Sequence, residues 1–250
     1  MTSETEIRAT IAKSVSTKDI QRDSTLQSLS KISQLLALVD DEQVDSLVAL
    51  GVGGGALTEA IGQAFEASEM HGIDTDPEAL DTASKRGITV YDINLETDPL
   101  PFEDDSIDLV VSFGLLEHLT WYDNVLSETE RVLRDCGYSI FAMPNMAGWT
   151  NRLSLLTGHQ PRNVEFSQDK PFGIMDAYDT DNTVGHVHTP TVSAFRELLE
   201  FHNFEVIDTV GLHPYQEGRL VALIDRLVDR RPSLCRRFAI LSRYRSGSEQ

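Results

Sequence analysis

The sequence predicts an α/β fold built on a doubly wound parallel sheet. From Val44 onward, short apolar runs alternate with stretches whose apolar residues recur at helical spacing. The first apolar run leads into a glycine cluster, in the segment SLVALGVGGGALTEAIGQA. Glycine weakens both strands and helices, so a cluster at a strand–helix junction indicates backbone that a ligand must approach closely.

The first half of this pattern predicts a series of strand–helix units. The expected strands are Ser46–Leu50, Glu69–Ile73, Ile88–Tyr91 and Ser106–Phe113. The expected helices are Ala56–Phe65, Pro77–Arg86 and the segment NVLSETERVLR. Strands that alternate with helices in this way form parallel sheets, because each helix carries the chain back to the start of the next strand.

The second half is interrupted once. After an expected strand at Tyr138–Pro144, residues 145–188 are polar, with scattered aromatic residues and turn formers. Connections of this length are usually functional. Thr189 is then the predicted N-cap of a helix, with Pro190 at its first position. A strand FEVIDTVGL, an amphipathic helix Arg219–Val228 and a last strand RFAILSRYR complete the expected order.

Residues 1–43 are expected to form a helical extension that precedes one domain of residues 44–250. Within the extension, Leu26, Leu29, Ile32, Leu35, Leu36 and Val39 recur at helical spacing. This pattern predicts a helix at the edge of the main domain.

The chain is strongly acidic, with 40 acidic and 21 basic residues and a formal net charge of −19. Such a surface suits a cytoplasm rich in salt, which screens self-repulsion, and so indicates a halophilic host or an acidic mesophilic one. It disfavours nucleic-acid binding. From Arg219 onward the balance reverses, with eight arginines against three acidic residues.

The cysteines and the N-terminus narrow the class of protein and its compartment. Cys136 and Cys235 lack the spacing of a disulfide framework or a zinc site, and no metal site is expected. The N-terminus MTSETEIRAT has no apolar signal core, and no apolar run approaches the length of a membrane span. We therefore expect a cytoplasmic protein.

The glycine loop restricts the classes of ligand that this site could bind. A helix N-terminus after a parallel strand favours an anionic group, and no Lys-Ser/Thr pair of a phosphate loop follows. A dinucleotide and S-adenosylmethionine remain as candidates. Asp74, at the tip of the second strand, could accept hydrogen bonds from an adenosine ribose, which both ligands carry.

Five segments in order resemble a class I S-adenosylmethionine-dependent methyltransferase, of the group that includes small-molecule and quinone-precursor enzymes. They are LVALGVGGG, GIDTDPEAL, DINLETDPLPFEDDSIDLVVSFGLLEHL, ETERVLRDCGYSIFAMPN and GHVHTPTVSAFRELLEFHNFEVI. The resemblance covers about Val44 to Arg245. The third segment favours S-adenosylmethionine over a dinucleotide, because a dinucleotide fold has no reason to carry LPFEDDSIDLVV before its fourth strand.

The resemblance implies a Rossmann-like sheet of seven mostly parallel strands with an antiparallel last strand, and S-adenosyl-L-methionine as cofactor. The cofactor-binding residues that it implies are Gly51, Gly53, Gly55, Asp74, Thr75, Asp92, Ile93 and Phe113. The glycines would face the methionyl group, Asp74 the ribose and Asp92 the adenine.

The sequence departs from the family pattern at two places. Ala49 stands where the family usually has an acidic residue two positions before the first glycine. The turn usually written Pro-Gly-Gly is Asp135-Cys136-Gly137, which keeps one glycine. Ala49 is the main support for an alternative, a methyltransferase-like scaffold with weak turnover.

Methyl transfer from a sulfonium is an in-line displacement, so the protein supplies alignment and a dry cavity, with a general base where the acceptor is a hydroxyl. Glu117 and His118 are the candidate catalytic residues; a structural role for the histidine is the alternative. Similar enzymes hold a divalent metal with this pair and an acid at the position of Gly114, which is absent here. His186 and His188 would point to opposite sides of an extended segment and make a poor metal pair.

By the resemblance, residues 145–188 cover the acceptor, and Trp149, Arg152, His159 and Tyr178 are candidate contacts. Residues 219–245 form an arginine-rich helix and last strand, whose arginines either pair with the acidic body or touch anionic lipid. The expected function is methylation, at oxygen, of a small and lipid- or glycan-linked acceptor. A nucleotide-cofactor oxidoreductase is the remaining enzyme alternative.

Overall fold

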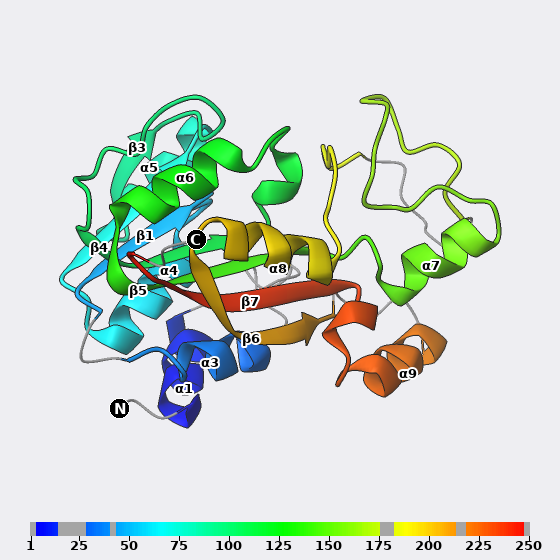
Figure 1. Ribbon diagram of the computed structural model, residues 1–250, viewed down its shortest axis with the longest axis horizontal. Coiled ribbons are helices and arrows are strands. Elements are labelled where there is room, and N and C mark those ends of the chain that lie inside the picture. Colours follow the sequence, from blue (N-terminus) through cyan, green and yellow to red (C-terminus); the bar gives the residue numbers. More distant parts are fainter. Residues whose placement is uncertain (1–3, 15–28, 41–43, 176–182, 214–218, 248–250) are drawn as a thin grey trace.

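The computed structural model describes residues 4–14, 29–40, 44–175, 183–213 and 219–247. Its α-helices are α1 (Glu4–Ser14), α3 (Leu29–Leu36), α4 (Ala56–Phe65), α5 (Pro77–Ser84), α6 (Asp123–Val132), α7 (Trp149–Leu156), α8 (Val192–Phe201) and α9 (Arg219–Val228). Its strands are β1 (Ser46–Leu50), β2 (Glu69–Asp74), β3 (Thr89–Asp92), β4 (Ile107–Phe113), β5 (Leu133–Pro144), β6 (Phe204–Leu212) and β7 (Arg237–Tyr244). The alternation expected from the sequence is present (Figure 1).

The strands form one seven-stranded sheet in the order β3-β2-β1-β4-β5-β7-β6. Neighbours from β3 to β5 pair in parallel, and β7 is antiparallel to both β5 and β6. The predicted fold class is confirmed. After β1 the chain builds β2 and β3 on one side of it, and then crosses to β4 on the other. This reversal opens a crevice at the carboxyl ends of β1 and β4, where α/β sheets bind their ligands.

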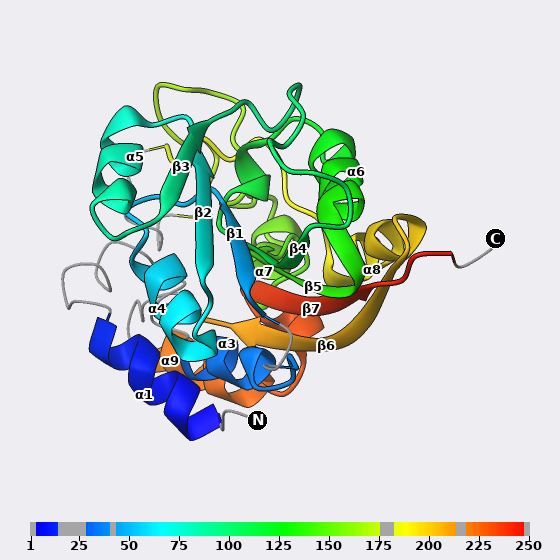
Figure 2. The ribbon, with the colours of Figure 1, turned by 90° about the vertical axis from the view of Figure 1, so that its left-hand side faces the viewer.

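Helices cover both faces of the sheet (Figures 1 and 2). Residues of α1, α3, α4 and α5 share one buried apolar cluster, and residues of α6 and α8 share the other. The central strand β1 is buried along its whole length, and β4 is buried except at Phe113. Burial on both faces explains why these strands read as continuous apolar runs.

The N-terminal residues add a helix that the sequence pattern did not predict. In α1, Ile7 and Ile11 lie one turn apart, are fully buried, and pack in the cluster that contains Ile32 and Leu35 of α3. The predicted helix at Leu26–Val39 is shorter in the structure, and Leu26 lies outside the described residues. The extension is thus continuous with the core beneath α4.

The predicted cap of α8 was wrong by two residues. The side chain of Thr191, instead of Thr189, accepts a hydrogen bond from the Ala194 amide at 3.2 Å, and the helix begins at Val192. Pro190 lies before the cap, where its carbonyl accepts from the amide of Met146 at 3.1 Å. That contact keeps Pro190 in the connecting segment.

Gly137, where the sequence predicted a turn, lies within β5 and is required there for a steric reason. The pairing of β4 with β5 shifts between Ile107 and Leu109, which lie opposite Leu133 and Tyr138. A Cβ atom at Gly137 would lie 2.9 Å from the Arg134 carbonyl oxygen. In place of the expected turn, β5 thus has a bulge with room only for glycine.

Two features concern the surroundings of the sheet. The segment 145–188, for which no helix was predicted, contains α7. Among the described residues, no helix combines the length and the apolar character that crossing a bilayer requires.

Candidate functional site

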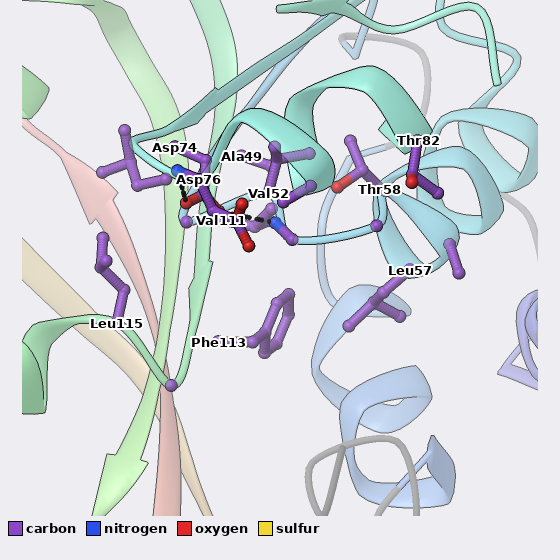
Figure 3. A pocket seen from close by; sticks show the side chains of 18 of the residues that line it. Ala49, Val52, Leu57, Thr58, Asp74, Asp76, Thr82, Val111, Phe113 and Leu115 are labelled. Carbon is purple, nitrogen blue, oxygen red and sulfur yellow. Dashed lines mark hydrogen bonds between the residues drawn. The ribbon is translucent and has the colours of Figure 1, made fainter. Parts of the chain in front are cut away.

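A cleft of about 580 Å³ lies at the carboxyl ends of β1, β2 and β4, at the reversal point of the sheet. Its walls are the glycine loop, the first turn of α4 and one side of α5 (Figure 3). Its volume falls within the range of small-molecule sites. The cleft is thus placed by topology and shaped by the loop that follows β1.

The loop requires glycine at two positions. Gly51 and Gly55 have φ angles of +72° and +74°, a region that side chains other than glycine rarely adopt. A Cβ atom at Gly51 would lie 2.9 Å from the Cβ of Leu115, and one at Gly55 would lie 2.7 Å from the Cδ1 of Ile88. The glycines therefore let the loop pack against Ile88, just before β3, and against the chain after β4.

The N-terminus of α4 opens into the cleft without a side-chain cap. Gly55 is the N-cap residue and offers no side-chain hydrogen bond. Ala56, Leu57 and Thr58, which form the first turn, all line the cleft. Amides of a first turn have no acceptor within their own helix and carry the positive end of its dipole. This end of the cleft therefore favours an anionic group.

Asp74 joins the two walls of the cleft. Its Oδ2 accepts a hydrogen bond from the Gly53 amide at 2.9 Å, and its Oδ1 accepts from the amides of Thr75 at 2.9 Å and Asp76 at 3.1 Å. A carboxylate can accept about four hydrogen bonds. Asp74 thus orders the glycine loop and retains capacity for a ligand hydroxyl.

The structure separates the predicted cofactor residues into two groups. The three glycines, Asp74 and Phe113 line the cleft, and the Phe113 ring projects toward it in Figure 3. Thr75, Asp92 and Ile93 are not among the described residues that line it. Asp92 is exposed beside Asp74 at the edge strand, and Ile93 packs against a core cluster. Their assignment to the cofactor stays a prediction.

Arg86 is a site residue that the sequence analysis missed. It lines the cleft, and its Nε donates to the carbonyl of Gly54 at 2.8 Å. Its Nη1 lies 2.6 Å from a carboxylate oxygen of Glu59 on α4. The guanidinium therefore fixes the loop from the α5 side, and no motif in the sequence marks an arginine for this contact.

The floor of the cleft is apolar. Ala49, Val52 and Val111 line it together, and all three are buried. The acidic residue that the family usually carries at position 49 is replaced here by a methyl group. Acidic groups line the cleft instead from α5 and the turn before it, at Asp76 and Glu78.

Glu117 lies behind the wall of the cleft that Gly114 forms. The side chain belongs to the short 3₁₀ helix η3 (Leu116–His118) after β4 and is 1% exposed. Its Oε1 lies 3.5 Å from an Nη2 of Arg237 on β7. A Cβ atom at Gly114 would lie 3.6 Å from the same Oε1. Because Gly114 has no side chain, only its backbone lies between the Glu117 carboxylate and the cleft.

His118 and Glu117 meet a third residue, His186, that the sequence analysis did not group with them. The rings of His118 and His186 have centroids 5.0 Å apart, and the Nε2 of His186 lies 3.8 Å from the Oε1 of Glu117. The ring of His188 instead packs against Tyr122. One potential ligand atom from each of Glu117, His118 and His186 lies within 4.8 Å of the others.

The Arg237 guanidinium faces the same carboxylate, and the expected absence of a metal here stays a prediction. Burial lowers the pKa of His186 to about 3, with further lowering by His118, Arg237 and Arg162. The His186 imidazole is therefore neutral at physiological pH. Glu117 faces the cation of Arg237 and a neutral imidazole.

The candidate acceptor contacts in the segment 145–188 make internal contacts. The indole of Trp149 donates to Asp225 at 2.8 Å, and the Nε of Arg152 donates to the Ala147 carbonyl at 2.6 Å. The Nδ1 of His159 lies 3.1 Å from the Thr157 hydroxyl. Tyr178 lies outside the described residues. The structure thus gives these side chains structural partners and leaves their contact with an acceptor a prediction.

Comparison with known proteins shows a similarity in the central part of the chain. Residues 48–141 match the model of the methyltransferase domain family. A probable S-adenosylmethionine-dependent methyltransferase of Mycolicibacterium smegmatis is 31% identical over 113 residues, which are 45% of this chain and 34% of that protein. The match thus spans about a third of the relative's length. Residues 48–141 are therefore similar to a methyltransferase domain.

Solved structures extend the likeness in fold to most of the chain. A methyltransferase structure from Mesorhizobium loti, described as S-adenosylmethionine dependent, has a TM-score of 0.58 at 17% identity, over 84% of this chain and 95% of that one. The complex of the Haloferax volcanii Trm112 methyltransferase activator with a methyltransferase also gives 0.58 at 17% identity, over 86% and 88%. At this identity the likeness shows the fold alone.

The loop geometry generates a paired test. We expect Gly55→Ala to lower the free energy of unfolding by about 2–3 kcal/mol, because it combines a positive φ with an overlap against Ile88. The neighbouring Gly54→Ala is the control, since its Cβ would meet only Thr82 at 3.6 Å, and we expect a change within about 1 kcal/mol. Chemical denaturation measures both. Equal effects would contradict the role given to the Gly55 backbone.

Proposed function

We propose that the protein transfers the methyl group of S-adenosylmethionine to a small-molecule acceptor. The observation that carries this proposal is the cleft at the reversal point of the sheet. It combines the glycine loop, the uncapped first turn of α4 and the carboxylate of Asp74. The glycine loop lets a ligand approach the backbone closely. The first turn of α4 suits the amino-acid carboxylate of the cofactor, and Asp74 suits a ribose hydroxyl. The residues present therefore fit the cofactor of the matched domain.

The bound cofactor supplies an activated methyl group on a sulfonium, and the protein supplies binding, alignment and exclusion of water. Ala56, Leu57 and Thr58 offer amides to an anionic end, while Asp74 holds the sugar and the glycine loop in one geometry. Ala49, Val52 and Val111 give the cleft an apolar floor. Phe113 lines the cleft near the chain that leads to His118.

We assign His118 the role of general base for methylation at oxygen. Its Nδ1 lies 3.1 Å from the carbonyl oxygen of Gly185, and a carbonyl can only accept a hydrogen bond. The proton of the neutral ring is therefore on Nδ1, which leaves the lone pair of Nε2 free to accept a proton from an acceptor hydroxyl. The ring is exposed, as contact with a second substrate requires.

Glu117 is a positioning residue in this proposal. Its carboxylate is buried between Arg237 and His186, and its carbonyl accepts from the amide of Val187 at 2.9 Å. Together with the His118–Gly185 contact, this bond ties the segment 183–188 to the end of β4. Glu117 thus holds in place the strip of chain that orients His118.

The finer parts of the proposal rest on the composition of the chain and on the segment 145–188. We place the protein among the small-molecule methyltransferases, with a lipid- or glycan-linked acceptor covered by residues 145–188 and no nucleic-acid partner. The net charge of −19 supports a salt-rich cytoplasm as its setting. A scaffold with weak turnover is the second candidate, and Ala49 in the cleft floor favours it.

Cofactor binding is tested by titration calorimetry with S-adenosylmethionine and S-adenosylhomocysteine. We expect both to bind, and we expect Asp74→Asn to lower their affinity at least about tenfold, because the amide loses acceptor capacity toward both the loop and the ribose. Asp81→Asn is the control, since Asp81 pairs with Lys85 on the exposed side of α5. Its affinity should equal that of the wild type.

Failure of the wild type to bind either compound would contradict the proposed cofactor site. Binding without methyl transfer to any fraction of a cell extract would favour the scaffold with weak turnover.

Catalysis is tested by transfer of a labelled methyl group to the lipid and aqueous fractions of a cell extract. We expect His118→Gln to lower the rate about 100-fold, the lower end of the effect of losing a general base, while its affinity for S-adenosylhomocysteine is unchanged. His71→Gln is the control, because His71 lies on β2 beside Tyr91 and Phe102, outside the cleft. A His118→Gln protein with the full rate would remove this residue from the mechanism.

A further inference from the structure

Helix α9 has its apolar side facing away from the protein. Its buried residue is Asp225, while Leu220, Leu223 and Leu227 are 69%, 55% and 75% exposed. These leucines are spaced three and four residues apart, so they form one stripe along the helix. A surface helix of a globular protein normally buries such a stripe.

Asp225 fixes this orientation. Its Oδ2 lies 2.7 Å from an Nη2 of Arg236, which is itself 6% exposed, and its Oδ1 accepts from the Trp149 indole at 2.8 Å. Burial acts to raise the pKa of Asp225, but hydrogen bonds from the side chains of His213, Trp149 and Arg236 lower it to about 2. A rotation of the helix that buried its leucines would separate Asp225 from Arg236 and leave each buried charge without its partner.

The neighbouring helix α7 is turned the same way. It buries the polar residues Thr150, Asn151 and Ser154. It exposes Leu153, Leu155 and Leu156, by 39%, 59% and 84%. The Trp149–Asp225 hydrogen bond joins α7 to α9, and both helices lie at the same end of the molecule (Figure 1). We call the leucines of these two helices, with the arginines of the next paragraph, the α7/α9 face.

The α7/α9 face is positively charged on an acidic protein. Arg219, Arg226, Arg230 and Arg231 are exposed, and within the described ranges none of them lies at ion-pair distance from a carboxylate. Arg219 and Arg226 lie two turns apart on α9, beside the leucine stripe, and Arg230 and Arg231 follow the end of the helix. Several arginines elsewhere are paired, for example Arg131 with Asp104 and Glu128.

We propose that the α7/α9 face docks on an anionic lipid bilayer. Exposed leucines beside a row of arginines match the two regions that an interfacial helix contacts, the acyl boundary and the anionic headgroups. A symmetric contact between two copies would bring two sets of arginines together, and Asp229, a partly exposed carboxylate that lines a pocket with Arg219 and Arg226, already pairs with Lys31 at 2.9 Å. The proposal does not depend on methyl transfer, since it concerns a surface away from the cofactor cleft.

Flotation with lipid vesicles tests the docking of the full chain. At about 0.1 M salt, where the Debye length is about 10 Å, we expect the protein to float with phosphatidylglycerol vesicles and not with phosphatidylcholine vesicles. We expect Leu223→Ser with Leu227→Ser to weaken the binding about tenfold or more, because apolar area is lost from the interface. Arg226→Glu with Arg230→Glu should weaken it at least about 30-fold.

The control variant replaces one exposed apolar residue and one exposed arginine on another helix. Phe201 is 68% exposed and Arg196 is exposed, both on α8, so Phe201→Ser with Arg196→Glu should leave the flotation unchanged. Circular dichroism melts show whether each variant folds, and the substituted positions are all exposed. The calorimetric titration with S-adenosylhomocysteine gives a reading of the cleft that the docking proposal does not affect.

Three outcomes would overturn the proposal. The first is that the wild type floats with neither kind of vesicle. The second is that the wild type and both face variants float equally. The third is a wild-type dimer without lipid that the leucine variant converts to a monomer, which would assign the face to self-association.

Discussion

The hydrogen bond from the Gly53 amide to the Asp74 carboxylate is the contact on which the cleft depends. It joins the loop after β1 to the tip of β2, at the point where the sheet reverses direction. The same carboxylate also accepts from two amides of the turn before α5. Because one side chain fixes both walls, the positions of the α4 amides and of a bound sugar are set together. Alignment of this kind is most of what methyl transfer asks of a protein.

Much of this arrangement could be predicted from the sequence, because it depends on local rules. Buried parallel strands read as apolar runs, as β1 and β4 do, and glycine at a strand–helix junction indicates a close backbone approach. The order of these elements, with Asp74 at the tip of the second strand, was enough to predict the sheet and the cleft. The antiparallel last strand came from the resemblance to a family.

The remaining features depend on contacts between distant parts of the chain. Arg86 reaches the Gly54 carbonyl, and His186 reaches Glu117, across separations that no local pattern records. The amphipathic pattern of α9 predicted a helix, but the periodicity cannot show which side is buried, and here the buried side carries Asp225. The cap at Thr191 was missed because Thr189 and Pro190 fit a helix start equally well, and only the Pro190–Met146 contact decides between them.

The most direct measurement is a crystal structure of the protein with S-adenosylhomocysteine. The account predicts electron density for the compound in the cleft, with its ribose hydroxyls at the Asp74 carboxylate and its amino-acid carboxylate at the first turn of α4. Density for the compound at another place, or a cleft that remains empty at saturating concentration, would contradict it.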